Sequence, residues 1–497
     1  YRIREYKTTH RKAVIDPAYD GAVIPPNIAP LNFMINESGN RYYVQIHSTT
    51  GKPIEISSRK PKIVIPLGPW KKMLAANRGL PIHFDIYVAD DEGQWVRFES
   101  LTNTIANEDI DGFLVYRPIK PMWAIYWRNM DIYQRNLESY KESPVLLSRT
   151  LGNGCLNCHL FSPNSPDRMV MHLRAGPGTG MFLTREGRVE VINTQTEFNS
   201  PVGYPAWHPS GELLTFSFNK VVQVFHATGE NRDALDLASD LVLYWIDSNT
   251  VQTSPKIASP DRMETWPVWS SDGRYLYFCS APLLESYSPA ENGDEHWEFE
   301  EMRYDLMRIG YDYQSGTWGE LEMVIAAAET GLSIAQPRIS PDGRFVLFCM
   351  SDYGAFPAFR PSSDLYLLDL RTGQHHRLDV NSDLSESYHS WSSNSRWIVF
   401  SSRRRNGLVA LPYFSYVDEE GKGYKPILLP QKDPTFYDTF IKNYNLPELV
   451  SEPVSTKSRD LIRAAFDNRR RLDARLDLAD PATRLSLEAK LTPLKEK

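Results

Sequence analysis

The sequence predicts a mainly β chain: a β-propeller preceded by a small β-sandwich and a cofactor-attachment segment, with a C-terminal helix. Two observations predict this fold class. Pairs of short apolar strands, joined by turns rich in Ser, Pro, Asp, Asn and Gly, recur along the second half of the chain. Aromatic residues make up 12% of the 497 residues, a composition that favours strands. Repeats of about 40–50 residues with several strands each are typical of propeller blades.

Four copies of the repeat align well. They are YPAWHPSGELLTFS (204–217), TWPVWSSDGRYLYFCS (265–280), AQPRISPDGRFVLFCMS (335–351) and SYHSWSSNSRWIVFSS (387–402). The first strand of each ends at an equivalent residue, namely Trp207, Trp269, Ile339 or Trp391. A fifth, degenerate copy is HLFSPNSPDRMVMHLR (159–174).

These repeats resemble the TolB-like propeller family, whose blades carry a Pro-x-Trp-Ser-Pro-Asp-Gly type of pattern. The match covers residues 160–430. The resemblance implies six blades, with the last closed by 431–450 together with strands from elsewhere in the chain.

The rest of the chain divides around this propeller. Residues 1–118 read as a β-sandwich-like domain, because short strands alternate with turn signals. Residues 119–160 are expected to be a helical linker that leads into the cofactor-attachment segment, and residues 161–450 form the propeller. In the tail, 451–497, apolar residues recur at helical spacing, which predicts one amphipathic helix over 455–480.

Charge and hydropathy exclude some classes of protein. The formal net charge of −7 argues against nucleic-acid binding, which needs a basic face. No apolar run approaches the roughly 18 residues that a membrane span needs. The chain begins at Tyr1 without a signal segment, so we expect an export signal to have been removed.

The most informative motif is CLNCH at 155–159. Two Cys three positions apart can form thioether bonds to haem, and the following His159 can bind the iron from the proximal side. Three alternatives remain: a zinc knuckle, which would need a second ligand pair, a thioredoxin-like redox pair, which would need a βαβ pattern, and a chance match. The lone Cys279 and Cys349 follow apolar runs and read as small buried residues.

Haem attachment by this motif takes place outside the cytoplasm, which predicts a periplasmic or cell-surface protein. The combination resembles exported bacterial proteins in which one haem-c motif directly precedes a TolB-like propeller. The haem- and propeller-bearing subunit of hydrazine synthase is similar in architecture. The single motif of this chain, where two are expected there, counts against the same reaction.

The sixth iron ligand has several candidates. His389 aligns with His159, since each stands two residues before the Trp or Phe of its repeat, and equivalent positions should meet near the propeller axis. The alternative is a hydrogen-bonded channel residue. His226 and Met171 are the next candidates, although Met171 alternates like a core residue and His172 lies on the opposite face. Arg128, Arg135, Arg168 and Arg174 flank the motif and could pair with a haem carboxylate, or be ordinary surface residues.

Three functions fit these observations. The first is electron transfer by a mono-haem c-type cytochrome, with the propeller as scaffold and docking surface for a redox partner or larger complex. The second is a haem enzyme with an open axial site, and the third is a binding module with a structural haem. The catalytic residues of an enzyme are not identifiable from the sequence.

Overall fold

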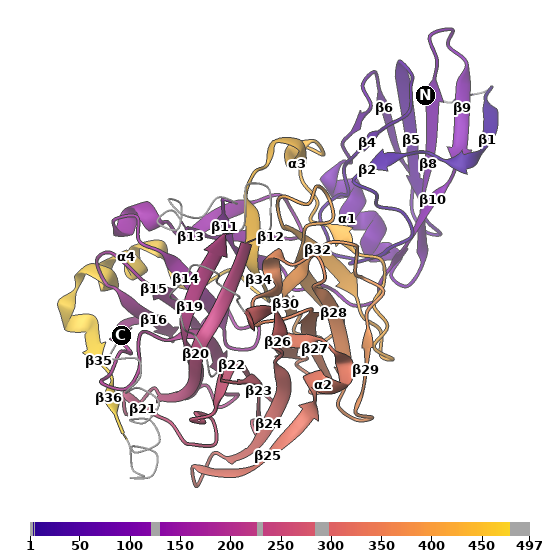
Figure 1. Ribbon diagram of the computed structural model, residues 1–497. Coiled ribbons are helices and arrows are strands. Elements are labelled where there is room, and N and C mark those ends of the chain that lie inside the picture. The colour runs from indigo at the N-terminus through magenta and orange to yellow at the C-terminus, as the bar shows by residue number, and fades with distance from the viewer. Residues whose placement is uncertain (1–2, 4, 121–129, 226–231, 284–297, 478–497) are drawn as a thin grey trace.

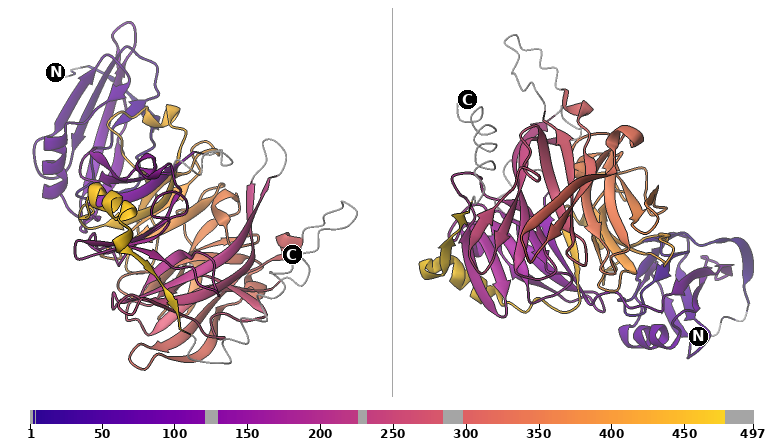
Figure 2. Two further views of the ribbon diagram at one scale, coloured as in Figure 1. Left: turned by 90° about the vertical axis from the view of Figure 1, so that its left-hand side faces the viewer. Right: turned by 90° about the horizontal axis from the view of Figure 1, so that it is seen from below.

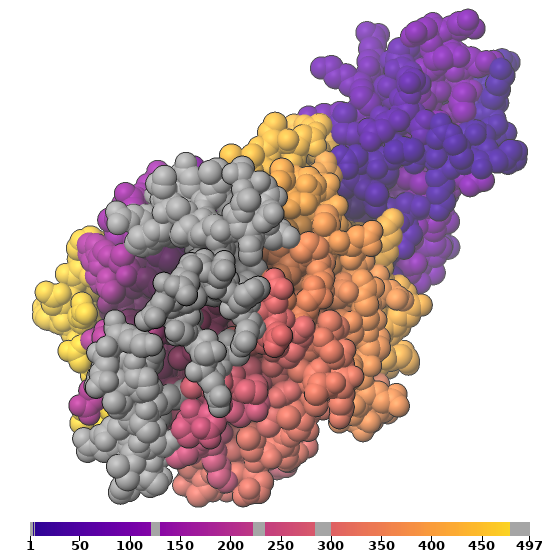
Figure 3. Space-filling model, viewed as in Figure 1, coloured from indigo at the N-terminus to yellow at the C-terminus, as the bar shows by residue number. Residues whose placement is uncertain are grey.

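The computed structural model describes residues 3, 5–120, 130–225, 232–283 and 298–477. Within them, the chain forms a six-bladed β-propeller and a smaller β domain that projects from its side as a separate lobe (Figures 1 and 3). The predicted mainly β fold is confirmed.

The N-terminal domain has two sheets and one helix. The larger sheet contains β1 (Lys7–Lys12), β3 (Val23–Ile24), β5 (Arg41–His47), β6 (Ile54–Ser58), β8 (Pro81–Ala89), β9 (Trp95–Glu99) and β10 (Leu101–Ile105). The smaller sheet contains β2 (Ile15–Asp16), β4 (Phe33–Ile35) and β7 (Lys62–Ile63), and α1 spans Leu67–Ala76. Alternation in β5 buries Val44 and Ile46 in the domain core. Trp70 of α1 is buried and donates to Ile28 O at 3.0 Å, which fixes the helix on the sheets.

Blades 1 to 5 each have four antiparallel strands, and the first of the four in sequence lies innermost. Blade 1 contains β14 (Leu156–Phe161), β15 (Met169–Leu173), β16 (Gly180–Arg185) and β17 (Arg188–Asn193). Blade 2 contains β18 (Gly203–Trp207), β19 (Leu213–Phe225), β20 (Arg232–Trp245) and β21 (Thr250–Gln252). Blade 3 contains β22 (Arg262–Trp269), β23 (Tyr275–Pro282), β24 (Asp305–Asp312) and β25 (Thr317–Ile325), with η2 (Glu298–Glu301) before β24.

The next two blades follow the same pattern. Blade 4 contains β26 (Ser333–Ile339), β27 (Phe345–Ser351), β28 (Asp364–Asp369) and β29 (Gln374–Arg377), with short helices α2 (Ala327–Thr330) and η3 (Pro357–Phe359). Blade 5 contains β30 (Glu386–Trp391), β31 (Trp397–Ser402), β32 (Leu411–Tyr416) and β33 (Ile427–Leu428). The repeat residues predicted from the sequence end the innermost strands of blades 2 to 5, so the predicted register is confirmed.

Blade 6 closes the ring with strands from two distant parts of the chain. Its innermost strand is β34 (Asn443–Val450), preceded by α3 (Phe436–Thr439), and its outer strands are β11 (Phe113–Ile119), β12 (Ile132–Asn136) and β13 (Glu142–Leu146). The innermost strands contact one another in the order β14, β18, β22, β26, β30, β34 and back to β14. The prediction of a helical linker is wrong over the described residues 130–154. They contain the strands β12 and β13 and the short η1 (Ser148–Leu151). Strand pairing, of β12 with β11 and of β13 with β12, outweighs the local helical preference here.

The C-terminal tail runs along the outer edges of blades 1 and 2 (Figure 2). The single helix expected over 455–480 is wrong: α4 (Ser458–Phe466) ends early and is followed by η4 (Asn468–Arg470), β35 (Arg471–Asp473) and β36 (Arg475–Leu476). β35 pairs with β17 and β36 with β21, both in parallel. The unpaired outer edges of these blades offer hydrogen bonds that the tail takes up as strands.

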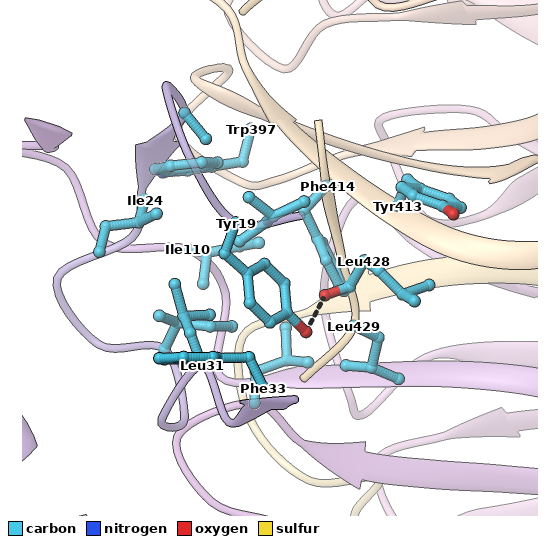
Figure 4. Close-up of a cluster of buried hydrophobic side chains, with 14 of the residues drawn as sticks. Tyr19, Ile24, Leu31, Phe33, Ile110, Trp397, Tyr413, Phe414, Leu428 and Leu429 are labelled. Carbon is cyan, nitrogen blue, oxygen red and sulfur yellow. Dashed lines mark hydrogen bonds between the residues drawn. The ribbon is translucent and has the colours of Figure 1, made fainter. Parts of the chain in front are cut away.

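The N-terminal domain packs on blade 5 through a shared apolar cluster (Figure 4). Tyr19 lies among its buried side chains and donates to Leu428 O at 3.2 Å. Trp397 donates to Glu108 O at 3.0 Å. The cluster joins the core of the small domain to that of the propeller, so we expect the two to unfold together.

In the part of the chain that the structure describes, no helix is long and apolar enough to cross a bilayer.

Candidate haem site

All six innermost strands carry the same distortion. In each, the register with the second strand shifts, and one residue adopts a left-handed conformation. These residues and their φ angles are Cys158 (49°), Tyr204 (44°), Trp266 (53°), Gln336 (57°), Tyr388 (44°) and Leu446 (49°). Such φ values are uncommon outside glycine, so their sixfold recurrence marks a bulge that is part of the fold.

The residue after each bulge is also patterned. It is Pro205, Pro267, Pro337 and Pro447 in blades 2, 3, 4 and 6. In blades 1 and 5 it is His159 and His389. The CLNCH motif therefore lies across the bulge of blade 1, where Cys158 takes the left-handed position and His159 the position otherwise held by proline.

The bulges line a central channel with three connected cavities. The middle one is lined by the bulge residues of all six blades, together with both histidines. A larger cavity of 580 Å³ opens above it and shares Cys158, Tyr204 and Tyr388 with it. A third cavity of 200 Å³ lies at the other end and shares Arg338 and Glu448 with the middle one.

His159 is buried, with 2% of its surface exposed, and neither ring nitrogen reaches a partner in hydrogen-bond geometry. The backbone of Val115 and Leu446 in blade 6 lies beside the ring without completing a bond. Burial lowers the pKa of His159 to about 3, helped by the positive charge of Arg117. The imidazole is therefore neutral at physiological pH, which is the form that binds metals. Buried imidazoles without a hydrogen bond are uncommon, and His172 is a second one among the described residues.

The two cysteines of the motif are free thiols. Cys158 lines the 580 Å³ cavity. Cys155 is 6% exposed, and its Sγ lies 3.7 Å from Sδ of Met130, which lines the same cavity. Burial raises the pKa of the Cys155 thiol, and the charges of Arg117 and Arg174 act in the opposite direction. Cys158 thus lies on the cavity wall, and Cys155 lies behind the wall, next to the side chain of Met130.

Arg117 of β11 holds the motif against blade 6. Its guanidinium donates to Leu156 O at 3.2 Å, to Asn157 Oδ1, and to Oδ1 of Asn445 on β34. Asn157 Oδ1 also accepts from the backbone of Cys158 at 2.9 Å. Arg117 and Asn157 together fix the loop conformation between the two cysteines.

The proposed distal ligand, His389, is buried and already bonded. Its Nε2 lies 3.0 Å from Leu347 O and its Nδ1 3.8 Å from Cys349 Sγ, both in blade 4. The ring thus points toward the preceding blade, and burial lowers the pKa of His389 to about 3. This geometry favours the hydrogen-bonded alternative, and binding iron would require the ring to leave Leu347.

The other candidates are dispersed. His226 and Arg128 lie outside the described residues. Met171 is fully buried in the apolar core of blade 1. His172 packs edge-on against Phe216 of blade 2 with ring centroids 5.7 Å apart, and its ring nitrogens have no bonded partner.

Of the flanking arginines that the structure describes, only Arg174 lines the large cavity. Arg135 is buried and donates to Pro430 O at 2.9 Å, in the outer part of blade 6. Arg168 lies beside Gly211 in the turn of blade 2.

The residues of the large cavity fit a haem. Its volume of 580 Å³ lies within the range of about 300–1,000 Å³ typical of cofactor pockets. Tyr204, Phe356 and Tyr388 provide aromatic walls, and Arg174 provides a cation suited to a carboxylate. The donor set of the motif is a pair of thiols for covalent attachment and a neutral imidazole for the iron. Cys158 lines the large cavity, whereas His159 lines the middle cavity and Cys155 lies behind Met130.

Sequence reasoning missed several residues of this site. Tyr204 and Tyr388 could have been found from the sequence, because in each of these repeats an aromatic residue directly precedes the Pro or His. Arg117 and Met130 left none, because their place in the site depends on the closure of blade 6. Among the described residues, no three His, Cys, Asp or Glu side chains gather as a further metal site. Cys279 and Cys349 are fully buried, as predicted.

No family model matches the chain, and no curated protein matches its sequence. Similar solved structures include an oligogalacturonate lyase from Vibrio parahaemolyticus, with a TM-score of 0.33 and 13% identity over 78% of this chain and 100% of that chain. The Dos1 propeller has a TM-score of 0.27 and 14% identity over 48% and 64% of the two chains. Prolyl oligopeptidase B from Galerina marginata has a TM-score of 0.35 and 8% identity over 69% and 42%. These values carry no argument about function.

Proposed function

We propose that this chain is an exported mono-haem c-type cytochrome that transfers electrons, located in the periplasm or at the cell surface. Its haem is attached at Cys155 and Cys158, and His159 is the proximal ligand. The observation that carries the proposal is the place of the CLNCH motif. Cys158 opens on a 580 Å³ cavity, and the adjacent His159 is buried with no hydrogen-bond partner.

A covalent haem supplies reversible one-electron transfer. The chain's own residues bind it and orient it. Arg117 and Asn157 hold the loop between the thiols, and Tyr204 and Tyr388 cover the cavity where it meets the channel. The propeller serves as a rigid scaffold whose outer surface is available to a redox partner.

A second function is favoured by the bonding of His389. Its Nε2 is engaged by Leu347 O and Met171 is packed in the core, so neither candidate faces the cavity as an available ligand. His226 lies outside the described residues, and Met130 lines the cavity. If neither binds the iron, a haem held by these residues could bind a small molecule, as in a haem enzyme.

The intact mass of the purified protein tests the proposal. It should exceed the mass of the chain by one haem, and the haem should remain with the protein on extraction with acidified acetone. Cys158→Ala should remove one thioether bond, whereas Cys279→Ala, on blade 3, should leave both. A protein without haem, or one whose haem extracts freely, would contradict the proposal.

Carbon monoxide separates the two functions. An electron-transfer site in which the protein supplies both axial ligands of the iron leaves the ferrous spectrum unchanged on addition of carbon monoxide. An open axial site binds the gas and changes the spectrum.

A further inference from the structure

The wall of the 580 Å³ cavity carries two arginines next to the CLNCH motif. They are Arg117 of β11 and Arg174 at the end of β15, and the described lining contains no Asp or Glu. The chain as a whole has a net charge of −7. Cations gathered in a concave site on an acidic protein attract anions, because a recess of low dielectric focuses their field.

None of the described residues that accept hydrogen bonds from the Arg117 guanidinium is a carboxylate. Only 6% of its surface is exposed, and its acceptors are one carbonyl oxygen and the amide oxygens of Asn157 and Asn445. Its buried Nε has no acceptor among the described residues. A buried guanidinium normally requires a negative partner to offset its loss of hydration.

Arg174 lies beside the haem-attachment motif. Its backbone N–H donates to Cys155 O at 3.0 Å, which anchors it at the end of β15. A methyl group added at Gly203 would lie 3.3 Å from its Nη2 and 3.9 Å from Cys158 Sγ, so guanidinium and thiol face the same small residue of blade 2. Arg174 is exposed and lines the cavity wall.

We propose that Arg117 and Arg174 form an oxyanion-binding site on this wall, next to Cys158. The ligand is a carboxylate or similar oxyanion, which a guanidinium binds through paired, charge-assisted hydrogen bonds. Two sources share this chemistry. One is the propionate groups of the haem, which rests on the proposed function, and the other is a free oxyanion that enters the cavity.

The test uses the purified holoprotein and the variant Arg174→Gln. Arg174 is preferred because Arg117 also supports the loop backbone. Arg188→Gln, an exposed arginine at the outer edge of the same blade, is the matched control. Infrared difference spectra between the oxidised and reduced forms report the haem carboxylates, and thermal melting in increasing inorganic phosphate reports a free oxyanion.

If the haem propionates occupy the site, their carboxylate bands shift in Arg174→Gln and stay in place in Arg188→Gln. If a free oxyanion occupies it, the bands do not move, but phosphate stabilises the parent and binds about tenfold more weakly to Arg174→Gln. Unchanged bands together with no specific effect of phosphate would overturn the proposal. A protein without haem fails the proposed function by its mass, and the phosphate measurement alone then decides the oxyanion site.

Discussion

His159 and His389 occupy the same place in two blades of the propeller. Each follows a left-handed residue at the bulge of an innermost strand, and each ring turns toward the preceding blade. His389 reaches Leu347 O on the second strand of blade 4. His159 lies beside the backbone of Val115 on the second strand of blade 6, and neither of its ring nitrogens has a described partner within hydrogen-bond geometry. The same backbone thus holds one satisfied and one unsatisfied imidazole, and the unsatisfied one belongs to the CLNCH motif.

Replacing His389 by Ala tests whether this residue contacts iron. We expect a loss of about 1–3 kcal/mol in unfolding free energy, because Leu347 O is left buried and unpaired. The ferric spectrum should keep its spin state. Chemical denaturation and the optical spectrum of the same sample measure both. A change from low spin to high spin would instead assign His389 to the iron, as the alignment of the repeats first indicated.

The ion pair at the lower end of the channel predicts a pH dependence. Arg338 Nη2 lies 2.7 Å from Glu448 Oε1, and Glu448 is buried, so that desolvation raises its pKa despite the arginine. Removing the cation by Arg338→Gln should raise this pKa further. It should also cost about 3–5 kcal/mol near neutral pH, because an uncompensated carboxylate stays buried.

The sign of the pH effect follows from proton binding. The pKa of Glu448 is higher in the folded state than in the unfolded state. At pH values between these two pKa values the folded state binds more protons, so the free energy of unfolding falls as pH rises. Urea unfolding of Arg338→Gln across this interval should therefore show a steeper fall than the parent. Adding Glu448→Gln should remove the difference in slope. An equal slope in both proteins would mean that Glu448 is not the group that titrates.

The C-terminal tail is predicted to stabilise the propeller through α4. Leu461 is fully buried and belongs to the core shared by blades 1 and 6. Leu461→Ala should therefore cost about 2–5 kcal/mol. The control is Leu472→Ala on β35, where the side chain is 37% exposed and the cost should stay below about 1 kcal/mol. Thermal and urea unfolding measure both, and equal losses would mean that the tail does not act through this contact.

The repeated blade strands could be predicted from the sequence. The strands that close the propeller ring could not, because they pair with distant parts of the chain. Trp207, Trp269 and Trp391 could be placed at strand ends, because the residues around each of them form the same short repeat. The strands at 113–146 could not be assigned to blade 6, because their partner β34 lies some 300 residues later. Likewise, the pattern of residues 455–480 is helical locally, and only the open edges of β17 and β21 turn its second half into strands.

The site was predicted to a similar extent. Spacing alone singled out Cys155, Cys158 and His159 as candidates, and the alignment placed His389 at the matching position of its blade. Arg117 could not be found, because it reaches the motif only after β11 docks beside β34. Its bond to Asn157 joins residues 40 positions apart.

The sharpest test of the haem ligand uses the repeat itself. Four blades carry proline where blade 1 carries His159, so the backbone at this position accepts proline after a left-handed residue. His159→Pro should therefore change the unfolding free energy by less than about 1 kcal/mol. The two thioether bonds should still form, since both cysteines remain.

In His159→Pro, the haem should lose its proximal imidazole, and the ferric spectrum should change accordingly. His389→Pro is the matched control, since it makes the same substitution at the same bulge of another blade and should leave the spectrum unchanged. Mass spectrometry confirms attachment in both variants, and optical spectra with urea unfolding compare ligation and stability. A parent-like spectrum in His159→Pro would show that His159, like His389, serves only the contact between blades, because no imidazole remains at that position to bind the iron.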